Sequence, residues 1–80
     1  MTVTRQLLLE QLENRFGLDA SSIEDTTLLF SSGLLDSFSV AELLMLIEEQ
    51  GGFRVEPTEI TLDNLDSIER ILAFAGRKTG

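Results

Sequence analysis

The stretch from Val40 to Ile47 most narrows the choice of fold, because its apolar residues recur with the period of an α-helix. They are spaced at i, i+3, i+4 and i+7, which places them along one face of a helix. These residues are Val40, Leu43, Leu44 and Ile47. The pattern predicts a helix that packs on one side against a core, and the Gly51–Gly52 pair is its predicted end.

Two start signals precede this helix. Asp36 can cap a helix that begins at Ser37, whereas Ser39 and Glu42 match a capping box three residues later. We favour Asp36 as the cap, which makes Ser37 the first residue of the helix.

A helix of the same kind is predicted near the start of the chain. It runs from about Val3 to Phe16, with Thr2 or Thr4 as its cap and Gly17 as its stop signal. Its apolar face consists of Leu8, Leu9, Leu12 and Phe16.

The last helix is predicted to follow Asp66, because Asp66 and Glu69 form an Asp-x-x-Glu box. Gly76 is expected to close it, with Arg77 and Lys78 at the favourable end of the helix dipole. Its core positions are Ile68, Ile71, Leu72 and Ala75, with Phe74 near the edge. One further helical turn is expected at 62–65, after Thr61.

The connection between the first two long helices, residues 18–35, has no sustained period. Its apolar residues are Ile23, Leu28, Leu29, Phe30, Leu34 and Leu35. A loop of this length in a small domain is usually functional or packed down, and we expect these side chains to hold it against the helices. The predicted fold is therefore all-α, a four-helix bundle of three longer helices and one short one. We expect it to be a single domain over residues 1–80.

The composition excludes several classes of function. The 80 residues contain no Cys and no His, so thiolate zinc sites and Ser–His or Cys–His nucleophile pairs cannot form. Six basic residues against fourteen acidic ones give a net charge of −8, which argues against nucleic acid as a partner. Twelve of the acids and one cation lie between residues 16 and 69, so the net charge of that stretch is −11. Such a surface favours partners with basic patches.

No signal for membranes or metals stands out. No stretch approaches the roughly 20 apolar residues of a membrane span. Glu10 and Glu13 interrupt the first apolar run, so a secretory signal is not expected and the cytoplasm is the default location. The acids lack the spacing of an EF-hand loop, and we expect no dedicated metal site.

The outward face of the second helix mixes acids with apolar groups. It carries Phe38, Ala41, Glu42, Met45, Glu48 and Glu49. The simplest interpretation is an ordinary solvated helix face. Ser37, however, lies at the N-terminal end of this helix, where free N–H groups and the positive dipole end would suit a phosphate ester on a serine side chain.

The segment Leu34-Leu35-Asp36-Ser37-Phe38, followed by Ser39-Val40-Ala41-Glu42-Leu43-Leu44, resembles the modification site of acyl carrier proteins. The resemblance extends to the chain length, the acidity, the long first loop and the order of the helices. It implies that the Ser37 hydroxyl receives 4′-phosphopantetheine from coenzyme A, donated by a phosphopantetheinyl transferase. The thiol of that arm would carry an acyl or aminoacyl group as a thioester, which suits a chain without a thiol of its own.

The resemblance assigns further roles by position. Asp36 matches the acid before the attachment serine, and no residue is expected to be catalytic. The partner-binding face would be Phe38, Ala41, Glu42, Met45, Glu48 and Glu49. Its partners would be the transferase, an acyl- or aminoacyl-loading ligase, and downstream acyl-processing enzymes with basic docking patches. The chain would act as a monomer in a fatty-acid, polyketide, nonribosomal-peptide or D-alanylation pathway.

Phe38 departs from the Leu that is usual in fatty-acid carriers, and the Gly33-Leu34-Leu35-Asp36-Ser37 pattern is more similar to stand-alone carriers, including the D-alanyl group. Leu65-Asp66-Ser67 repeats the tripeptide around Ser37, but we interpret Asp66 as a helix cap and favour Ser37 as the attachment site. The alternative function is an acidic helical interaction module without a prosthetic group. A small hydrolase with paired carboxylates would need a pocket, which we do not expect in so small a bundle.

Overall fold

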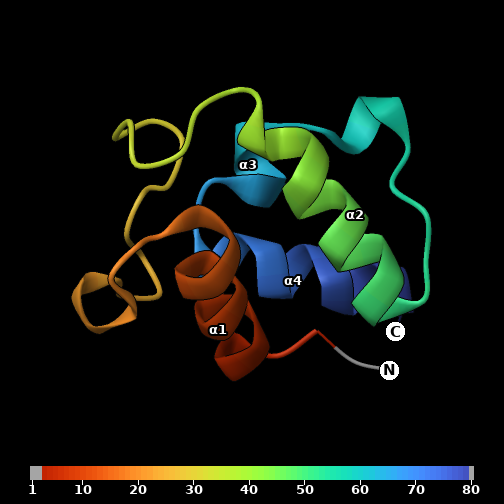
Figure 1. Cartoon of the computed structure of the whole chain (residues 1–80). Helices are drawn as coiled ribbons and strands as arrows, with labels where there is room; N and C mark the ends of the chain where they lie inside the picture. Colours follow the sequence, from red (N-terminus) through yellow and green to blue (C-terminus); the bar gives the residue numbers. More distant parts are fainter. Residues whose placement is uncertain (1–2, 80) are drawn as a thin grey trace.

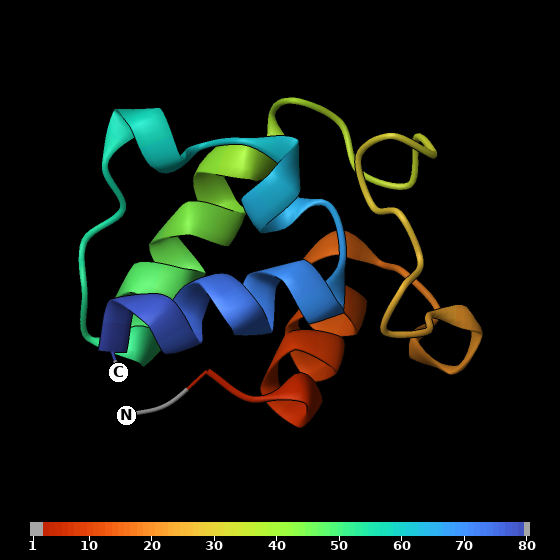
Figure 2. The ribbon, with the colours of Figure 1, turned by 180° about the vertical axis from the view of Figure 1, so that it is seen from behind.

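A computed structural model describes residues 3–79 of the chain, all of whose regular elements are helical (Figure 1). The elements are α1 (Arg5–Phe16), η1 (Ala20–Ser22), α2 (Ser39–Gly51), η2 (Pro57–Glu59), α3 (Leu62–Leu65) and α4 (Ile68–Thr79). The prediction of an all-α bundle with three longer helices and one short one is confirmed. α4 contacts α1, α2 and α3, so it is the element on which the others assemble (Figures 1 and 2).

Helix α1 begins at Arg5, two residues later than predicted. The Thr4 hydroxyl accepts a hydrogen bond from the N–H of Leu7 at 3.1 Å, so Thr4 is the cap, and the alternative Thr2 lies outside the described residues. Gly17 ends the helix with φ of 70°, a left-handed conformation that glycine adopts without strain. Leu8 and Leu12 are buried against the rest of the core.

Helix α2 buries a wider face than the predicted stripe. Leu43 and Ile47 are fully buried as expected, whereas Val40 and Leu44 are only half-buried. Leu46, which lies outside the stripe, is 2% exposed and belongs to the core. The helix ends as predicted, because Gly52 has φ of 71° and donates its N–H to the Glu48 carbonyl at 2.9 Å.

Helix α4 differs from its prediction at both ends. Its first turn is capped by the Ser67 hydroxyl, which accepts from the N–H of Arg70 at 3.1 Å. The predicted box of Asp66 and Glu69 is wrong, because the Asp66 carboxylate accepts hydrogen bonds from the long loop instead. Gly76 does not close the helix, which continues to Thr79.

Two contacts explain the longer C-terminal part of α4. Arg77 donates to the Asn64 side chain at 2.7 Å, and Lys78 pairs with Glu59 at 2.9 Å, so the last turn is held against the segment around α3. A glycine inside a helix costs only about 1 kcal/mol relative to alanine, which these contacts can offset. Phe74, predicted near the edge, is 2% exposed and meets Phe53 edge-on with ring centres 6.0 Å apart.

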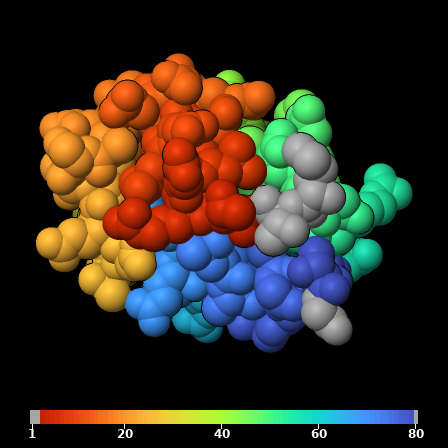
Figure 3. Space-filling view, turned by 90° about the horizontal axis from the view of Figure 1, so that it is seen from below, coloured from red at the N-terminus to blue at the C-terminus, as the bar shows by residue number. Residues whose placement is uncertain are grey.

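The long loop is packed down, as predicted. Ile23, Leu29 and Leu35 are buried in the same core as the helices, whereas Leu28 and Leu34 remain 40% and 44% exposed. The loop is also tied to α4, because the N–H of Glu69 donates to the Asp25 carbonyl at 2.9 Å. Figure 3 shows α1 and α4 side by side, with the first half of this loop at one end of the pair.

Within residues 3–79, no helix has the length and apolar character needed to cross a membrane.

Candidate functional site

Ser37 lies in an exposed turn directly before α2, at the end of the long loop. The helix begins at Ser39, so the prediction that Ser37 is its first residue is wrong by two positions. The cap position is taken by Phe38, which makes no side-chain capping bond. Asp36 still supports the start of the helix from two residues earlier, because its carboxylate accepts from the N–H groups of Phe38 at 3.1 Å and Ser39 at 3.0 Å. The Ser39 hydroxyl also donates to this carboxylate at 3.1 Å, which places Ser39 inside the first turn rather than at a capping box.

The geometry of this turn leaves the Ser37 side chain accessible. The Asp36 carboxylate holds the backbone of the two residues after Ser37, Phe38 and Ser39. Ser37 itself is exposed and lies in the turn before the helix. Asp36 already accepts from the N–H of Ser39, but the start of α2 still carries the positive end of the helix dipole. A phosphate ester on the Ser37 oxygen is therefore compatible with this position.

The predicted partner-binding residues share the exposed side of α2, with one exception. Phe38 is 86% exposed and Met45 is 64% exposed, and Ala41, Glu42 and Glu49 are exposed beside them. Glu48 is half-buried, and its carboxylate accepts from the N–H of Val55 at 2.7 Å. Glu48 therefore holds the segment after α2 in place and is less available to a partner than the sequence pattern predicts.

A pocket of about 400 Å³ opens next to Ser37, contrary to the expectation that so small a bundle has none. It is lined by three segments that are distant in the sequence, namely the long loop, the start of α2, and the approach to α3 together with α3 itself. Its lining residues are Phe30, Leu35, Asp36, Ser37, Val40, Ile60, Thr61, Leu62 and Leu65. No local periodicity predicts a pocket between such segments. The one signal in the sequence is the pair of apolar residues Ile60 and Leu62 on either side of Thr61, and both are exposed in the structure.

A second hollow of about 380 Å³ also involves Asp36 and is more polar. Arg15, at the end of α1, lines it together with Phe38 and Glu42. The turn that carries Ser37 is thus bordered by an apolar pocket on one side and by a hollow lined in part by Arg15 on the other.

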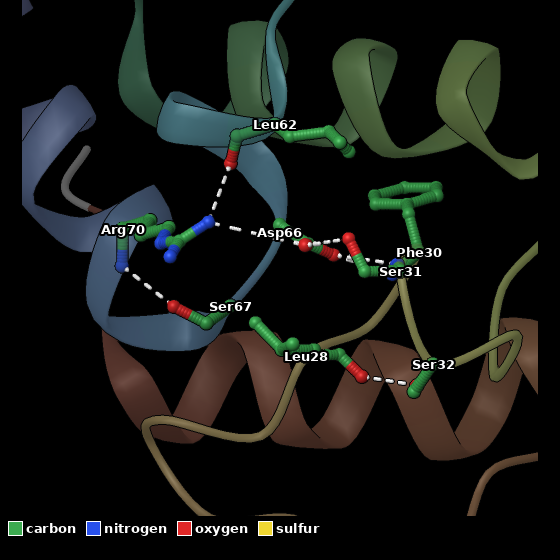
Figure 4. A network of polar contacts seen from close by, with 8 residues as sticks. All are labelled: Leu28, Phe30, Ser31, Ser32, Leu62, Asp66, Ser67 and Arg70. Atoms are coloured by element: carbon green, nitrogen blue, oxygen red, sulfur yellow. Dashed lines mark hydrogen bonds and ion pairs between the residues drawn. The ribbon is translucent and has the colours of Figure 1, made fainter.

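Asp66 is the most connected acid near this region (Figure 4). It is 1% exposed, and its carboxylate accepts from the N–H groups of Phe30 at 2.6 Å and Ser31 at 3.0 Å, and from the Ser31 hydroxyl at 2.5 Å. Arg70 lies 3.9 Å away. Burial by itself would raise the pKa of Asp66, but the hydrogen bonds from Ser31 and Phe30 and the charge of Arg70 outweigh it and lower the pKa below its usual value.

The repeated tripeptide around Ser67 is structural. Ser67 is 2% exposed, and its hydroxyl caps α4 by accepting from the N–H of Arg70. An enzyme cannot reach a buried hydroxyl that is already engaged in a cap. Burial thus distinguishes Ser67 from the exposed Ser37, whereas the local sequence pattern alone does not distinguish them. Within residues 3–79, no group of three or more acidic side chains comes together as a metal site.

Comparison with known proteins gives the site its family. Residues 6–74 match the family described as "Phosphopantetheine attachment site". The chain is 39% identical over 46 residues to the D-alanyl carrier protein of Abiotrophia defectiva, and 49% identical over 43 residues to that of Bacillus pumilus. It is 41% identical over 61 residues to the lincomycin biosynthesis protein LmbN of Streptomyces lincolnensis.

These alignments are partial. They cover 58%, 54% and 76% of this chain, and 58%, 55% and 22% of the Abiotrophia, Bacillus and Streptomyces proteins, respectively. No solved structure matches the chain significantly. The family match spans nearly all of the helical fold, including the exposed serine turn and the helix behind it, and the chain therefore belongs to the phosphopantetheine attachment site family.

Proposed function

We propose that this chain is a carrier domain that bears 4′-phosphopantetheine on Ser37 and holds an acyl or aminoacyl group on the thiol of that arm. The observation that carries the proposal is the position of Ser37, which is exposed directly before α2 and beside an apolar pocket. The family match indicates that the prosthetic group is phosphopantetheine. We treat residues 1–80 as one such domain, and its cytoplasmic location and monomeric state stay predictions.

The proposed modification uses only what the serine turn offers. The Ser37 oxygen would attack the β-phosphorus of coenzyme A on a phosphopantetheinyl transferase. The new O–P bond forms as the bond to adenosine 3′,5′-bisphosphate breaks, and the hydroxyl proton passes to a base of the transferase. The product is a phosphodiester at the positive end of α2. The chain itself supplies no catalytic group in this scheme and acts as the substrate of other enzymes.

Partner enzymes are proposed to dock on the exposed side of α2. Phe38 and Met45 offer apolar contacts, and Glu42 and Glu49 offer negative charge to a basic patch. Ala41 lies exposed between them. Glu48 contributes less, because its carboxylate is engaged by the backbone of Val55. Association driven by such charges should weaken as salt is added.

The relatives favour a specialised pathway. Two are named as D-alanyl carrier proteins, and the third is named for lincomycin biosynthesis. We therefore propose an amino acid or a secondary-metabolite acyl group as cargo, loaded by an adenylating ligase. The Leu-Leu-Asp-Ser-Phe sequence, with Phe38 after the serine, is consistent with this choice.

The test is intact mass spectrometry after incubation with a broad-specificity phosphopantetheinyl transferase and coenzyme A. The wild-type chain should gain the mass of one phosphopantetheinyl group. Ser37→Ala should gain nothing, whereas Ser39→Ala, which removes the neighbouring hydroxyl, should still gain one group. An unchanged mass of the wild-type chain would favour the alternative, an acidic interaction module without a prosthetic group.

A further inference from the structure

Asp66 holds three consecutive residues of the long loop. Its carboxylate accepts from the N–H groups of Phe30 and Ser31 and from the Ser31 hydroxyl, and its backbone carbonyl accepts from the N–H of Leu29 at 2.7 Å. We call these contacts of Asp66 with residues 29–31 the Asp66 network. Asp66 directly follows α3, so the network fastens the loop to the end of that helix (Figure 4).

Residues on both sides of this network line the pocket beside Ser37. Phe30 lines it from the loop, and Leu65, the residue before Asp66, lines it from α3. The N–H of Leu35 donates to the Leu29 carbonyl at 2.8 Å, which transmits the constraint to a residue only two positions before Ser37. The network therefore fixes the distance between two walls of the pocket and the path of the loop that leads into the serine turn.

The groups around the Asp66 carboxylate show why its oxygens matter more than its charge alone. Ser31 and Phe30 supply three donors from the loop, and Arg70 lies at 3.9 Å, with the same nitrogen donating to the Leu62 carbonyl at 3.3 Å. An amide in place of the carboxylate keeps an oxygen for the two N–H groups and a donor for the Ser31 hydroxyl. A methyl group leaves two partly buried N–H groups without an acceptor.

We propose that Asp66 is a positioning residue for the modification of Ser37, because it keeps the loop, the serine turn and the pocket in the arrangement that the transferase recognises. This inference rests on the proposed function, in which Ser37 is the acceptor. Loss of the network lowers the fraction of chains that hold the competent arrangement. The apparent affinity of the transferase for the chain then falls in proportion to that fraction. A binding defect of this kind raises KM and leaves kcat unchanged.

The experiment measures steady-state kinetics of phosphopantetheinyl transfer with the carrier as the varied substrate. Asp66→Ala should raise KM about tenfold with little change in kcat, as expected if about one chain in ten keeps the competent arrangement. Asp66→Asn should restore most of the wild-type KM, although it has the same net charge as Asp66→Ala. The matched control is Asp63→Ala, which removes an exposed acid from α3 and should leave KM within about twofold of wild type.

Amide hydrogen exchange accompanies the kinetics. The N–H groups of Phe30 and Ser31 should exchange faster in Asp66→Ala than in the wild type, while the core of α4 stays protected. If Asp66→Ala does not fold, Ser31→Ala removes only the hydroxyl contact and should raise KM by a smaller factor, about threefold.

Three results would overturn the proposal. One is a folded Asp66→Ala with faster exchange at Phe30 and Ser31 but a wild-type KM, because the network would then be broken without consequence. Another is a rise in KM that Asp66→Asn shares in full, which would assign the effect to charge. A loss of kcat at unchanged KM is the third. Failure of the proposed function is distinct, because the wild-type chain itself would then not be modified.

Discussion

Two glycines of the helices should respond in opposite directions to the same substitution by alanine. Gly76 lies inside α4, exposed, with no atom within 4 Å of the position that a β-carbon would take. Replacing glycine by alanine inside a helix stabilises it by about 1 kcal/mol. Since nothing opposes the new methyl group, Gly76→Ala should raise the free energy of unfolding by about that amount.

Gly51, the last residue of α2, is buried under the ring of Phe53. A β-carbon there would lie 2.2 Å from Cε2 of that ring, well inside the roughly 3.5 Å of ordinary carbon–carbon contact. The ring would have to swing away and lose its edge-on contact with Phe74, worth about 0.5–1.5 kcal/mol, as well as part of its apolar burial, worth about 1–2 kcal/mol. The helix gain of about 0.5–1 kcal/mol is smaller. Gly51→Ala should therefore destabilise the fold by about 1–2 kcal/mol.

Urea unfolding followed by circular dichroism measures both changes. With a slope of about 1 kcal/mol/M for a domain of this size, the midpoint should rise by about 1 M for Gly76→Ala and fall by 1–2 M for Gly51→Ala. The slope should be the same in all three proteins. A lower midpoint for Gly76→Ala would refute the reasoning, because it would mean that α4 ends at Gly76, as its sequence predicts, rather than at Thr79.

Three further predictions concern the surface and pH. Phe38→Ala should change the free energy of unfolding by less than about 0.5 kcal/mol, because the side chain is 86% exposed. The same substitution should weaken binding to the transferase in a titration. A large loss of stability would contradict this prediction. Sodium chloride should raise the melting temperature by screening the −11 stretch, and a melting temperature indifferent to salt would count against self-repulsion. Burial would raise the pKa of Asp66, but hydrogen bonds from Ser31 and Phe30 outweigh it and lower the pKa below its usual value. The stability that Asp66 contributes is therefore complete above the pKa of the unfolded chain, about 3.9, and is lost as the pH falls through the pKa of the folded chain. Asp66→Asn should accordingly unfold less steeply with acid than the wild type, and equal steepness would be the contrary result.

The helices follow from the sequence because their signals are local. The apolar stripes and the Gly17 and Gly52 stop positions depend on residues within a few positions of one another. The structure ends both helices at these glycines, and it buries part of each stripe, with Val40 and Leu44 only half-buried. The hydrogen bonds from Asp36 to the start of α2 are equally local, since their donors are two and three residues away.

The errors occur where a distant contact competes with a local pattern. Asp66 has the spacing of a capping box with Glu69, yet its carboxylate accepts hydrogen bonds from the loop residues Phe30 and Ser31, which lie 36 and 35 positions earlier. The cap then passes to Ser67. Gly76 carries a stop signal, but the last turn of α4 is held by contacts to Asn64 and Glu59.

The candidate site was predictable in its centre and not in its surroundings. Ser37 stands out by its place before an amphipathic helix, and its exposure agrees with the role proposed for it. The pocket beside it arises from three segments that meet only in the folded chain, so its existence cannot be deduced from periodicity. The same holds for Glu48, whose contact with Val55 removes it in part from the acidic face.

The most direct test of the central claim is to locate the modification in the chain. After reaction of the wild-type chain with the transferase and coenzyme A, proteolysis and fragmentation mass spectrometry should place a single phosphopantetheinyl group on Ser37. The group should be absent from the peptide that contains Ser67, whose hydroxyl is buried in the cap of α4. A group found on Ser67, on Ser39 or on no residue at all would contradict the account.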